Sequence, residues 1–399
     1  MVAGQAFGHR VRAAFGLEPG LTYLNHGAFG AVPLAVAEAQ AGWRRRIEAN
    51  PTRFFSDDGP EAIRAAARGL ARRFGGRGRD WAFVTNATTG VSTVLDSLRI
   101  GAGDVILTTD LAYPSVLRAL HYFTARAGAE LRIASLPVPL PGAGPVLDAV
   151  AEALSDGAVR FALFDHIASP TGALLPVAEL AALCRRQGVP VLVDGAHAPG
   201  QVPLDVPAIG AAAYVGNLHK WCFAPRGAGM LWVDPQFQGR IEPPVIAKPL
   251  DEGFPRSFDY LGTFDPSAWL AAADGFAFAD IWGAAEIAAA NAGLARRAGL
   301  QLAAAWDTEV ATAPEMAAAL AAIRLPLAGE RLRALAERHG DLFRAGRAVG
   351  RGLRERHGIE VPVVAHRGLL WVRVSAQIYN EMEDYARLVT ALPQELAAQ

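Results

Sequence analysis

Residues 189–221 read VPVLVDGAHAPGQVPLDVPAIGAAAYVGNLHKW, and the fold can be predicted from this stretch. An apolar run at 189–193 ends at Asp194, and a second run at 213–215 is soon followed by Lys220. Continuous apolar strands joined by helical connections are typical of a parallel sheet that helices cover on both faces. Such sheets bind ligands at the carboxyl ends of their strands, so we expect this carboxylate and this amine at one functional edge.

The lysine content makes one of these positions unusual. The chain has 38 basic residues, of which 36 are arginine and only Lys220 and Lys248 are lysine. Arginine cannot lose its proton or form an imine, so a lysine retained at a strand end indicates a need for an amine. In a desolvated pocket, such an amine has a lowered pKa and serves as nucleophile and base. Lys248 lies in a proline-rich irregular segment and is interpreted as a solvated residue.

The same pattern of short apolar runs and helical stretches extends over the first two-thirds of the chain. We expect strands at 81–85, 105–108, 131–135, 161–164, 189–193, 213–215 and 230–233, with helical patterns at 90–98 and 177–187 among others. From about residue 267 the sequence becomes alanine-rich and helical, with one strand pattern at 368–374. This predicts a large α/β domain over 21–266 and a small α+β domain over 267–399, with residues 1–20 packing beside the small domain.

Composition excludes several classes of function. The 399 residues carry a net charge of −1, which provides no field to attract nucleic acid or an anionic membrane. We find no signal-peptide core at the start and no charge-free apolar stretch long enough to span a membrane. The two cysteines, Cys184 and Cys222, are too few for a disulfide framework. The expectation is a cytoplasmic protein with no nucleic-acid or membrane partner.

Other strand ends carry candidate ligand-binding groups, each with a structural alternative. Thr88 and Thr89 open a helix, where they either hold a phosphate or cap the helix. Tyr113 follows another strand and either covers a planar ligand or packs in the core. Asp194 either caps a turn or holds a protonated ring nitrogen. The acidic and histidine side chains lack the helical i, i+4 spacing of a zinc pair, so no metal site is expected.

Taken together, these strand ends resemble the class V aminotransferase family of pyridoxal-phosphate enzymes, and within it the isopenicillin N epimerase-like branch. The resemblance extends from Leu24-Asn25-His26-Gly27 to the segment 375–380. Its most specific parts are Asp194-Gly195-Ala196-His197 and the His219-Lys220-Trp221 group, in which Lys220 follows Asp194 by 26 residues. The resemblance implies fold type I, with a seven-stranded, mostly parallel sheet between helices and a smaller C-terminal α+β domain. It also implies pyridoxal 5'-phosphate as cofactor and a homodimer with shared active sites.

The resemblance further implies roles for individual residues around the cofactor ring. Lys220 would attach the cofactor through an imine, and Asp194 would pair with its pyridinium nitrogen. Tyr113 would stack on the ring, and His197 would reach its phenolic oxygen with Ser169 nearby. The residues implied to hold the phosphate are Thr88, Thr89, Asn217 and His219, with Thr263 reaching the phosphate of the neighbouring subunit. The residues implied to contact an amino-acid-type substrate are Asn25, His26 and Arg373, and the arginine would grip the α-carboxylate.

The chemistry that follows from such a site is removal of the substrate Cα proton by Lys220. Return of a proton on the opposite face gives epimerisation, which is our leading hypothesis and needs a second acid or base. His26, His166 and Tyr260 are the candidates. A carbon–sulfur β-lyase acting on a cysteine conjugate or sulfoxide is the alternative, and an aminotransferase is another.

Two further readings are disfavoured by the sequence. No cysteine follows Cys222, which argues against a desulfurase that forms a persulfide on a mobile C-terminal loop. A non-catalytic cofactor-binding protein would not need both Asp194 and Lys220, because binding alone requires no imine-forming amine.

Overall fold

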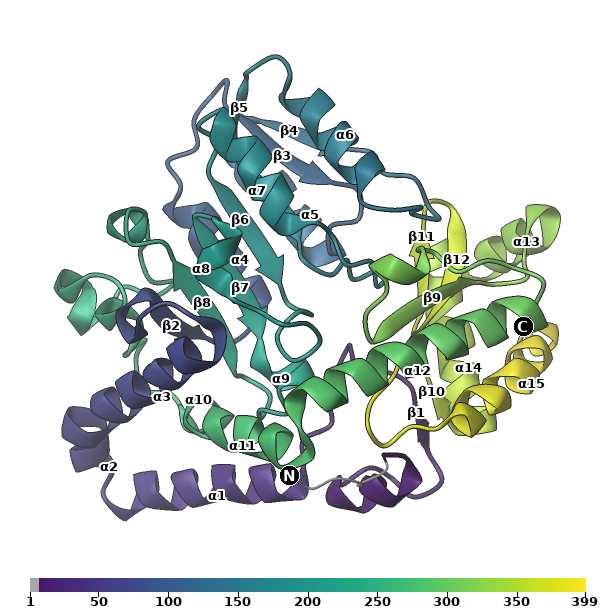
Figure 1. Cartoon of the computed structure of the whole chain (residues 1–399), viewed down its shortest axis with the longest axis horizontal. Coiled ribbons are helices and arrows are strands. Elements are labelled where there is room, and N and C mark those ends of the chain that lie inside the picture. The colour runs from purple at the N-terminus through teal and green to yellow at the C-terminus, as the bar shows by residue number, and fades with distance from the viewer. Residues whose placement is uncertain (1–6) are drawn as a thin grey trace.

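The seven strands predicted from the apolar runs form one sheet in the computed structural model, which describes residues 7–399 (Figure 1). The strand order is β2-β8-β7-β6-β5-β3-β4. The neighbours from β7 to β4 pair in parallel, whereas β8 runs antiparallel to both β7 and β2. The strands are β2 (Trp81–Val84), β3 (Val105–Thr109), β4 (Glu130–Ala134), β5 (Val159–Asp165), β6 (Val191–Gly195), β7 (Ala213–Asn217) and β8 (Gly229–Val233). The prediction of a seven-stranded, mostly parallel sheet is therefore confirmed.

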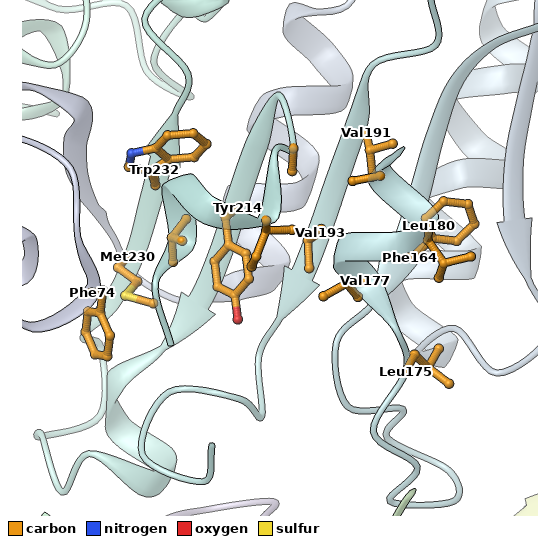
Figure 2. Close-up of a cluster of buried hydrophobic side chains, with 14 of the residues drawn as sticks. Phe74, Phe164, Leu175, Val177, Leu180, Val191, Val193, Tyr214, Met230 and Trp232 are labelled. Carbon is orange, nitrogen blue, oxygen red and sulfur yellow. The ribbon is translucent and has the colours of Figure 1, made fainter. Parts of the chain in front are cut away.

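Helices cover both faces of this sheet. Successive side chains of a strand point to opposite faces, and in these strands both sets are apolar and need to be buried. On one face α4 (Ala87–Ser97) and α5 (Pro114–Ala127) pack on Leu192 and Val215. On the other face, Val193 and Tyr214 lie in a second core cluster, part of which Figure 2 shows. The helices that contribute to this second cluster are α3 (Gly59–Phe74), α6 (Gly144–Leu154), α7 (Val177–Arg186) and α8 (Val206–Ile209). Both faces are dry, which is why the strands read as unbroken apolar runs.

A smaller antiparallel sheet lies beside the large one, with the order β11-β12-β9 (Figure 1). Its strands are β9 (Leu320–Arg324), β11 (Val363–His366) and β12 (Leu369–Ser375). The helices that surround it are α12 (Ala284–Ala305), α13 (Gly329–His339), α14 (Leu342–His357) and α15 (Met382–Ala398). Leu302, Ile323, Val349 and Val372 belong to its separate hydrophobic cluster.

The sequence predicted only β12 in this part of the chain, and the alanine-rich texture around β9 was expected to be helical. Strand β9 instead pairs with β12, and its small side chains allow α12 to approach closely. A Cβ built on Gly299 of α12 would lie 3.1 Å from the Cβ of Ala321. Alanine here serves tight helix–sheet packing, which overrides its intrinsic preference for helix.

The N-terminal segment joins the C-terminal part. Strand β1 (Thr22–Tyr23) pairs in parallel with β10 (Ile359–Glu360), and the Gly8 amide donates to the Ile378 carbonyl at 2.7 Å. Of the residues 1–20 expected to pack with the small domain, 1–6 lie outside the described residues. The division at residue 267 stays a prediction, since Trp269 in α10 (Ser267–Leu270) packs in the cluster of the large sheet.

Three more α-helices lie along the large sheet's part of the molecule (Figure 1), and they are α1 (Leu34–Ala49), α2 (Pro51–Arg53) and α11 (Ala272–Trp282). Two predicted helices are found with small shifts in their ends, since α4 begins at Ala87 and α7 ends at Arg186. Among the described residues, no helix is both long and apolar enough to cross a membrane.

Candidate active site

Lys220 lies on a single helical turn, α9 (Leu218–Trp221), directly after β7. Lys220 is partly exposed, so a small molecule can reach its side chain. Most of the surroundings of its amine are nevertheless protein atoms and not water. Nζ lies 3.1 Å from Nε2 of His197. Burial, and then the positive charge of Arg373, lower the pKa of Lys220 to about 7, against the opposing effect of two nearby carboxylates. A large fraction of this amine is therefore neutral near pH 7, as a nucleophile and base must be.

Two buried carboxylates lie side by side near this amine. Asp194 and Asp165 are register partners at the ends of β6 and β5, and are 3% and 2% exposed. Asp194 Oδ1 accepts a hydrogen bond from the Ala196 amide at 2.9 Å, whereas Asp165 Oδ2 is buried with no hydrogen-bond partner among the described residues. Burial raises the pKa of both groups, and the charge of Asp194 raises that of Asp165 further. A cation that binds here would favour an ionised Asp194.

His197 links Lys220 to the loop that follows β6. Its carbonyl accepts from Nε2 of Gln201 at 2.7 Å, and Gln201 in turn accepts from the Ala319 amide at 2.7 Å. Burial, and then the charges of Lys220 and Arg373, hold the pKa of His197 well below its usual range. The ring is therefore neutral, and its Nδ1 is buried with no hydrogen-bond partner in the described structure.

The start of α4 forms a polar cup at the same edge of the sheet. The Asn86 side chain caps the helix by accepting from the Thr89 amide at 2.9 Å. The Asn217 side chain at the end of β7 accepts from the Ala87 amide at 2.8 Å, so it fixes the helix start to the strand. Thr88, whose side chain is exposed, occupies the second helical position. Amides at a helix N-terminus and adjacent hydroxyls are suited to a phosphate.

His219 presents a second donor or acceptor near this cup. Its Nδ1 lies 3.0 Å from the Ala228 carbonyl, which can only accept, so Nδ1 carries a proton in the neutral ring and Nε2 does not. Burial, and then the charge of Lys220, lower the pKa of His219 to about 4.

Arg373 on β12 reaches across from the small sheet to the large one. Its Nη1 donates to both the carbonyl oxygen and Oγ of Ser169, at 2.7 and 2.8 Å. The side chain is 5% exposed and its Nε is buried without a hydrogen-bond partner in the described residues. Burial lowers the pKa of Arg373 to about 10, while the nearby Tyr113 hydroxyl acts in the opposite direction, so the group stays charged. A guanidinium held on one side and unpartnered at Nε is suited to a carboxylate.

The family model for class V aminotransferases matches residues 22–388 of this sequence. The chain belongs to the class V aminotransferase family. It is thus a pyridoxal-phosphate-dependent class V enzyme, and the resemblance of the strand-end motifs to this family is confirmed.

Relatives with two different activities are similar over almost their whole length. Putative L-cysteine desulfhydrase 1 of Oryza sativa subsp. japonica is 32% identical, over 94% of this chain and 83% of the rice protein. The isopenicillin N epimerase of Streptomyces clavuligerus is also 32% identical, over 94% of this chain and 95% of that enzyme. Among solved structures, the cystine C–S lyase C-DES with its product cysteine persulfide has a TM-score of 0.76 at 22% identity, covering 94% of this chain and 97% of its own. This last likeness shows the fold.

The residues at the sheet edge fit pyridoxal phosphate on physical grounds. Lys220 supplies a desolvated amine, Asp194 a buried carboxylate, and α4 an N-terminus with hydroxyls. Buried polar atoms of Asp165 and His197 have no hydrogen-bond partner in the described structure, and a polar group bound between them would supply one. The chemistry that the cofactor supplies when bound is an electron sink for a carbanion at the substrate Cα.

Several predicted site residues are placed differently from the expectation. His26 is fully buried, with its nitrogens at the Tyr379 hydroxyl and the Lys220 carbonyl, which leaves no free ring atom for a substrate. His166 bonds the hydroxyl of Tyr214, whose ring packs in the core on the sheet face opposite α4. Ser169, expected near the cofactor ring, accepts from Arg373 through both its carbonyl oxygen and its Oγ.

Other predicted residues lie where a ligand or a second subunit could meet them. Asn25 is buried with its side-chain oxygen unpartnered among the described residues. Tyr113 is 39% exposed at the start of α5. Thr263 is exposed and follows Gly262, whose φ of +90° favours glycine. Tyr260 is half-buried in the same segment.

Sequence reasoning missed Asp165 as part of the site. The rule that singled out Asp194 also applies to Asp165, since both end an interior strand of the same sheet. Gln201 was missed as well, and its pairing with Ala319, which is 118 residues away in the sequence, leaves no local signal.

Proposed function

We propose that this enzyme is a carbon–sulfur β-lyase that acts on an amino acid with sulfur on Cβ. The observation that carries this proposal is that both histidines considered as a second base are engaged elsewhere, which leaves Lys220 and, of the other candidates, only the half-buried Tyr260. Lys220 is partly accessible, whereas the nitrogens of His26 are engaged and Nδ1 of His166 is bonded on the far side of the sheet. A β-elimination needs one base at Cα, whereas epimerisation needs a second group on the opposite face.

In the proposed reaction Arg373 binds the substrate carboxylate and orients the Cα hydrogen toward Lys220. Nζ of Lys220 takes that proton. The electron pair then forms the Cα–Cβ double bond as the C–S bond breaks, and sulfur leaves with the C–S pair. The Lys220 ammonium can return its proton to the departing sulfur. Water hydrolyses the remaining amino-acrylate to pyruvate and ammonia, so the reaction consumes one water molecule.

The surrounding groups assist without changing charge near pH 7. Asp194 would hold a protonated ring nitrogen of the cofactor, and its burial strengthens that interaction. His197 lies 3.1 Å from Nζ of Lys220 and is kept neutral, so it orients the amine and does not compete for its proton. Thr88 and Thr89 are proposed to hold the phosphate, with Asn217 fixing the helix start. His219 would donate to the phosphate only when its Nε2 is protonated, because Nδ1 already donates to the Ala228 carbonyl.

The cysteines support release of sulfur and not its transfer to the protein. Cys184 and Cys222 are the only cysteines of the chain, and both are buried. Burial raises the pKa of each thiol to about 12, so neither is a thiolate near pH 7. Two free, buried thiols also support the proposed cytoplasmic location.

Epimerisation is the second candidate, favoured by the similarity to the Streptomyces clavuligerus epimerase over 95% of that protein. A product assay separates the two. The cofactor-loaded protein is incubated with L-cysteine, cysteine conjugates and their sulfoxides in deuterated water. Pyruvate and ammonia in equal amounts support the lyase. Deuterium at Cα with inverted configuration and no pyruvate overturns it in favour of an epimerase, and a keto acid with aminated cofactor overturns it in favour of an aminotransferase.

The attachment point is tested separately. Borohydride reduction of the coloured protein should fix the cofactor on the peptide that contains Lys220. Lys248, the only other lysine, is exposed and serves as the internal control. A label on Lys248, or retention of the label in a Lys220→Ala variant, would overturn the assignment.

We further propose that the active unit is a homodimer in which Thr263 reaches the phosphate of the neighbouring subunit. Support comes from the exposure of this residue on a turn that extends from the large domain. Sedimentation of the loaded protein should give twice the chain mass, and Thr263→Ala should release the cofactor about threefold to tenfold faster, the loss of one hydrogen bond. A monomer with full activity would overturn both statements.

A further inference from the structure

His26 lies between the catalytic lysine and the strand that carries the substrate-binding arginine. Its ring is fully buried, with 0% exposure, and lies against Trp221 at 5.1 Å between ring centroids. Nε2 is 2.8 Å from the backbone carbonyl oxygen of Lys220, and Nδ1 is 2.9 Å from the hydroxyl of Tyr379. The two partners are far from His26 in sequence, since 194 and 353 residues separate them from it.

The protonation of this ring follows from its partners. Nε2 faces the Lys220 carbonyl at 2.8 Å, which can only accept, and the Gln377 amide nitrogen at 3.0 Å, which can only donate. We assign the proton to Nε2 for the shorter contact, so that Nε2 donates to the Lys220 carbonyl and the Gln377 nitrogen makes no hydrogen bond to it. Nδ1 is then the acceptor, which agrees with the Tyr379 hydroxyl at 2.9 Å and the Ala31 amide at 3.4 Å, both of which can donate to it. Burial lowers the pKa of His26 to about 4, so the ring is neutral near pH 7. Because neither nitrogen is free, the ring cannot serve as the second acid or base.

Tyr379 belongs to the segment that continues from β12. Arg373 lies near the end of that strand, and Gln377 and Tyr379 follow it. Nε2 of Gln377 lies 3.0 Å from Nε2 of His26, and the Gln377 side-chain oxygen is fixed by Asn291 at 2.9 Å and by the Ile378 amide at 2.8 Å. All of these side chains are buried, and the hydrogen bonds of the Gln377 oxygen and of the Tyr379 hydroxyl fix the segment beside the ring.

A second contact ties the two segments together beside the ring. The Gly27 amide donates to Oγ of Ser375 at 2.9 Å, in the last residue of β12. A Cβ built on Gly27 would lie 2.8 Å from Cδ2 of Leu320 and 3.1 Å from Oγ of Ser375, so a larger residue here would displace one of these buried side chains. The residues around His26 are therefore packed directly on the arginine-bearing strand.

We propose that His26 is a positioning residue that couples the Arg373 strand to the backbone of Lys220. The coupling runs from β12 through the Tyr379 hydroxyl to Nδ1 of the ring, and from Nε2 to the lysine carbonyl. This coupling fixes the position of the single turn α9 relative to β12, and with it the distance between the Lys220 amine and a substrate held by Arg373. The inference rests on the proposed role of Lys220 as attachment point and base, and holds equally for a lyase or an epimerase.

The test compares two substitutions of the same ring in the cofactor-loaded protein. His26→Leu keeps apolar volume but removes the donor to Lys220. His26→Gln retains a side-chain N–H that can reach the same carbonyl. His166→Leu is the matched control, because it removes a buried histidine that bonds a tyrosine hydroxyl but has no contact with Lys220. Thermal midpoints of all three are recorded with their kinetics.

We expect His26→Leu to lower kcat about 10-fold to 100-fold with KM within threefold, since a displaced amine affects the chemical step and not carboxylate binding. The pH at which the visible cofactor band changes should shift by about one unit, because this band reports protonation of the imine at Nζ and a displaced turn changes the distance of Nζ from the charges of Asp194 and Arg373. His26→Gln should recover at least part of both effects. His166→Leu should lower the thermal midpoint similarly but leave kcat and the pH of the band change near wild type.

Three outcomes would overturn the inference. One is a His26→Leu protein with unchanged kcat and band pH, and another is a His166→Leu protein that shows the same shifts. The third is a His26→Gln protein as impaired as His26→Leu. Failure of the proposed function is distinguishable, because it would appear as a borohydride label away from Lys220 in the wild-type protein, whatever the His26 variants do.

Discussion

The contact between Arg373 and Ser169 gives a prediction whose size can be worked out from the structure. Ser169→Ala removes Oγ, which accepts from Nη1 of Arg373 at 2.8 Å, but leaves the Ser169 carbonyl at 2.7 Å. A hydrogen bond to a charged group contributes about 1.5–3 kcal/mol. Because the carbonyl still holds the guanidinium, the loss should lie at the lower end, about 1.5 kcal/mol, or roughly 10-fold in substrate binding.

The assay is initial-rate kinetics of the cofactor-loaded protein on its best sulfur amino acid. KM should rise about 10-fold while kcat changes less than threefold, because the arginine binds the ground state and the transition state alike. Arg373→Lys, which removes the planar fork altogether, should raise KM about 100-fold.

Thr171→Ala is the matched control. Thr171 lies in the same loop and is 1% exposed. In the described residues its hydroxyl makes one hydrogen bond, which it accepts from the Ala173 amide at 3.3 Å. It has no contact with Arg373 and should leave KM unchanged. The reasoning is refuted if Ser169→Ala leaves KM within twofold of wild type, or if Thr171→Ala raises KM as much.

Three further predictions concern stability and cofactor retention. Burial lowers the pKa of Lys220 to about 7 in the folded protein from 10.5 in the unfolded chain, so the unfolded chain binds more protons between these pH values. The free energy of unfolding of the cofactor-free protein should therefore fall by up to about 1.4 kcal/mol per pH unit as the pH is lowered from 10.5 to 7. Urea unfolding of Lys220→Met should lack this contribution, and equal slopes in both proteins would contradict it. Arg64 and Asp259 form a buried pair at 2.5 Å, so Arg64→Leu should cost about 3–5 kcal/mol in urea unfolding, and adding Asp259→Leu should recover most of it. Asn217→Ala removes the acceptor that fixes the Ala87 amide, and with it the start of α4, to strand β7. The phosphate-binding end of the helix then loses its position, so cofactor binding should weaken about 10-fold in equilibrium dialysis. An unchanged affinity would contradict this prediction.

The large sheet could be predicted because each interior strand is apolar on both faces and ends at a polar or small residue. That pattern can be read from neighbouring residues in the sequence. It predicts that Asp194 and Lys220 lie at the same edge of the sheet, although it does not give the distance between them. Strand β9 could not be predicted, because its alanines reflect the close approach of α12, which is a tertiary contact.

The role of His26 could not be predicted for a related reason. The motif around Asn25 and His26 indicates that these residues lie close to the binding site, but it does not indicate which way the His26 ring points. The direction depends on the Tyr379 hydroxyl and the Lys220 carbonyl, which the folded chain brings from distant parts of the sequence. Asp165, by contrast, could have been found from its strand end alone.

The contrast between the two lysines has a practical consequence. Lys220 is desolvated within the site, whereas Lys248 is exposed in a surface segment, and no other side chain carries a primary amine. In the cofactor-loaded enzyme, coupling reagents directed at amines would therefore modify one surface side chain, in addition to the α-amino group. A fluorophore or a solid support attached at Lys248 would give a uniformly oriented population of molecules.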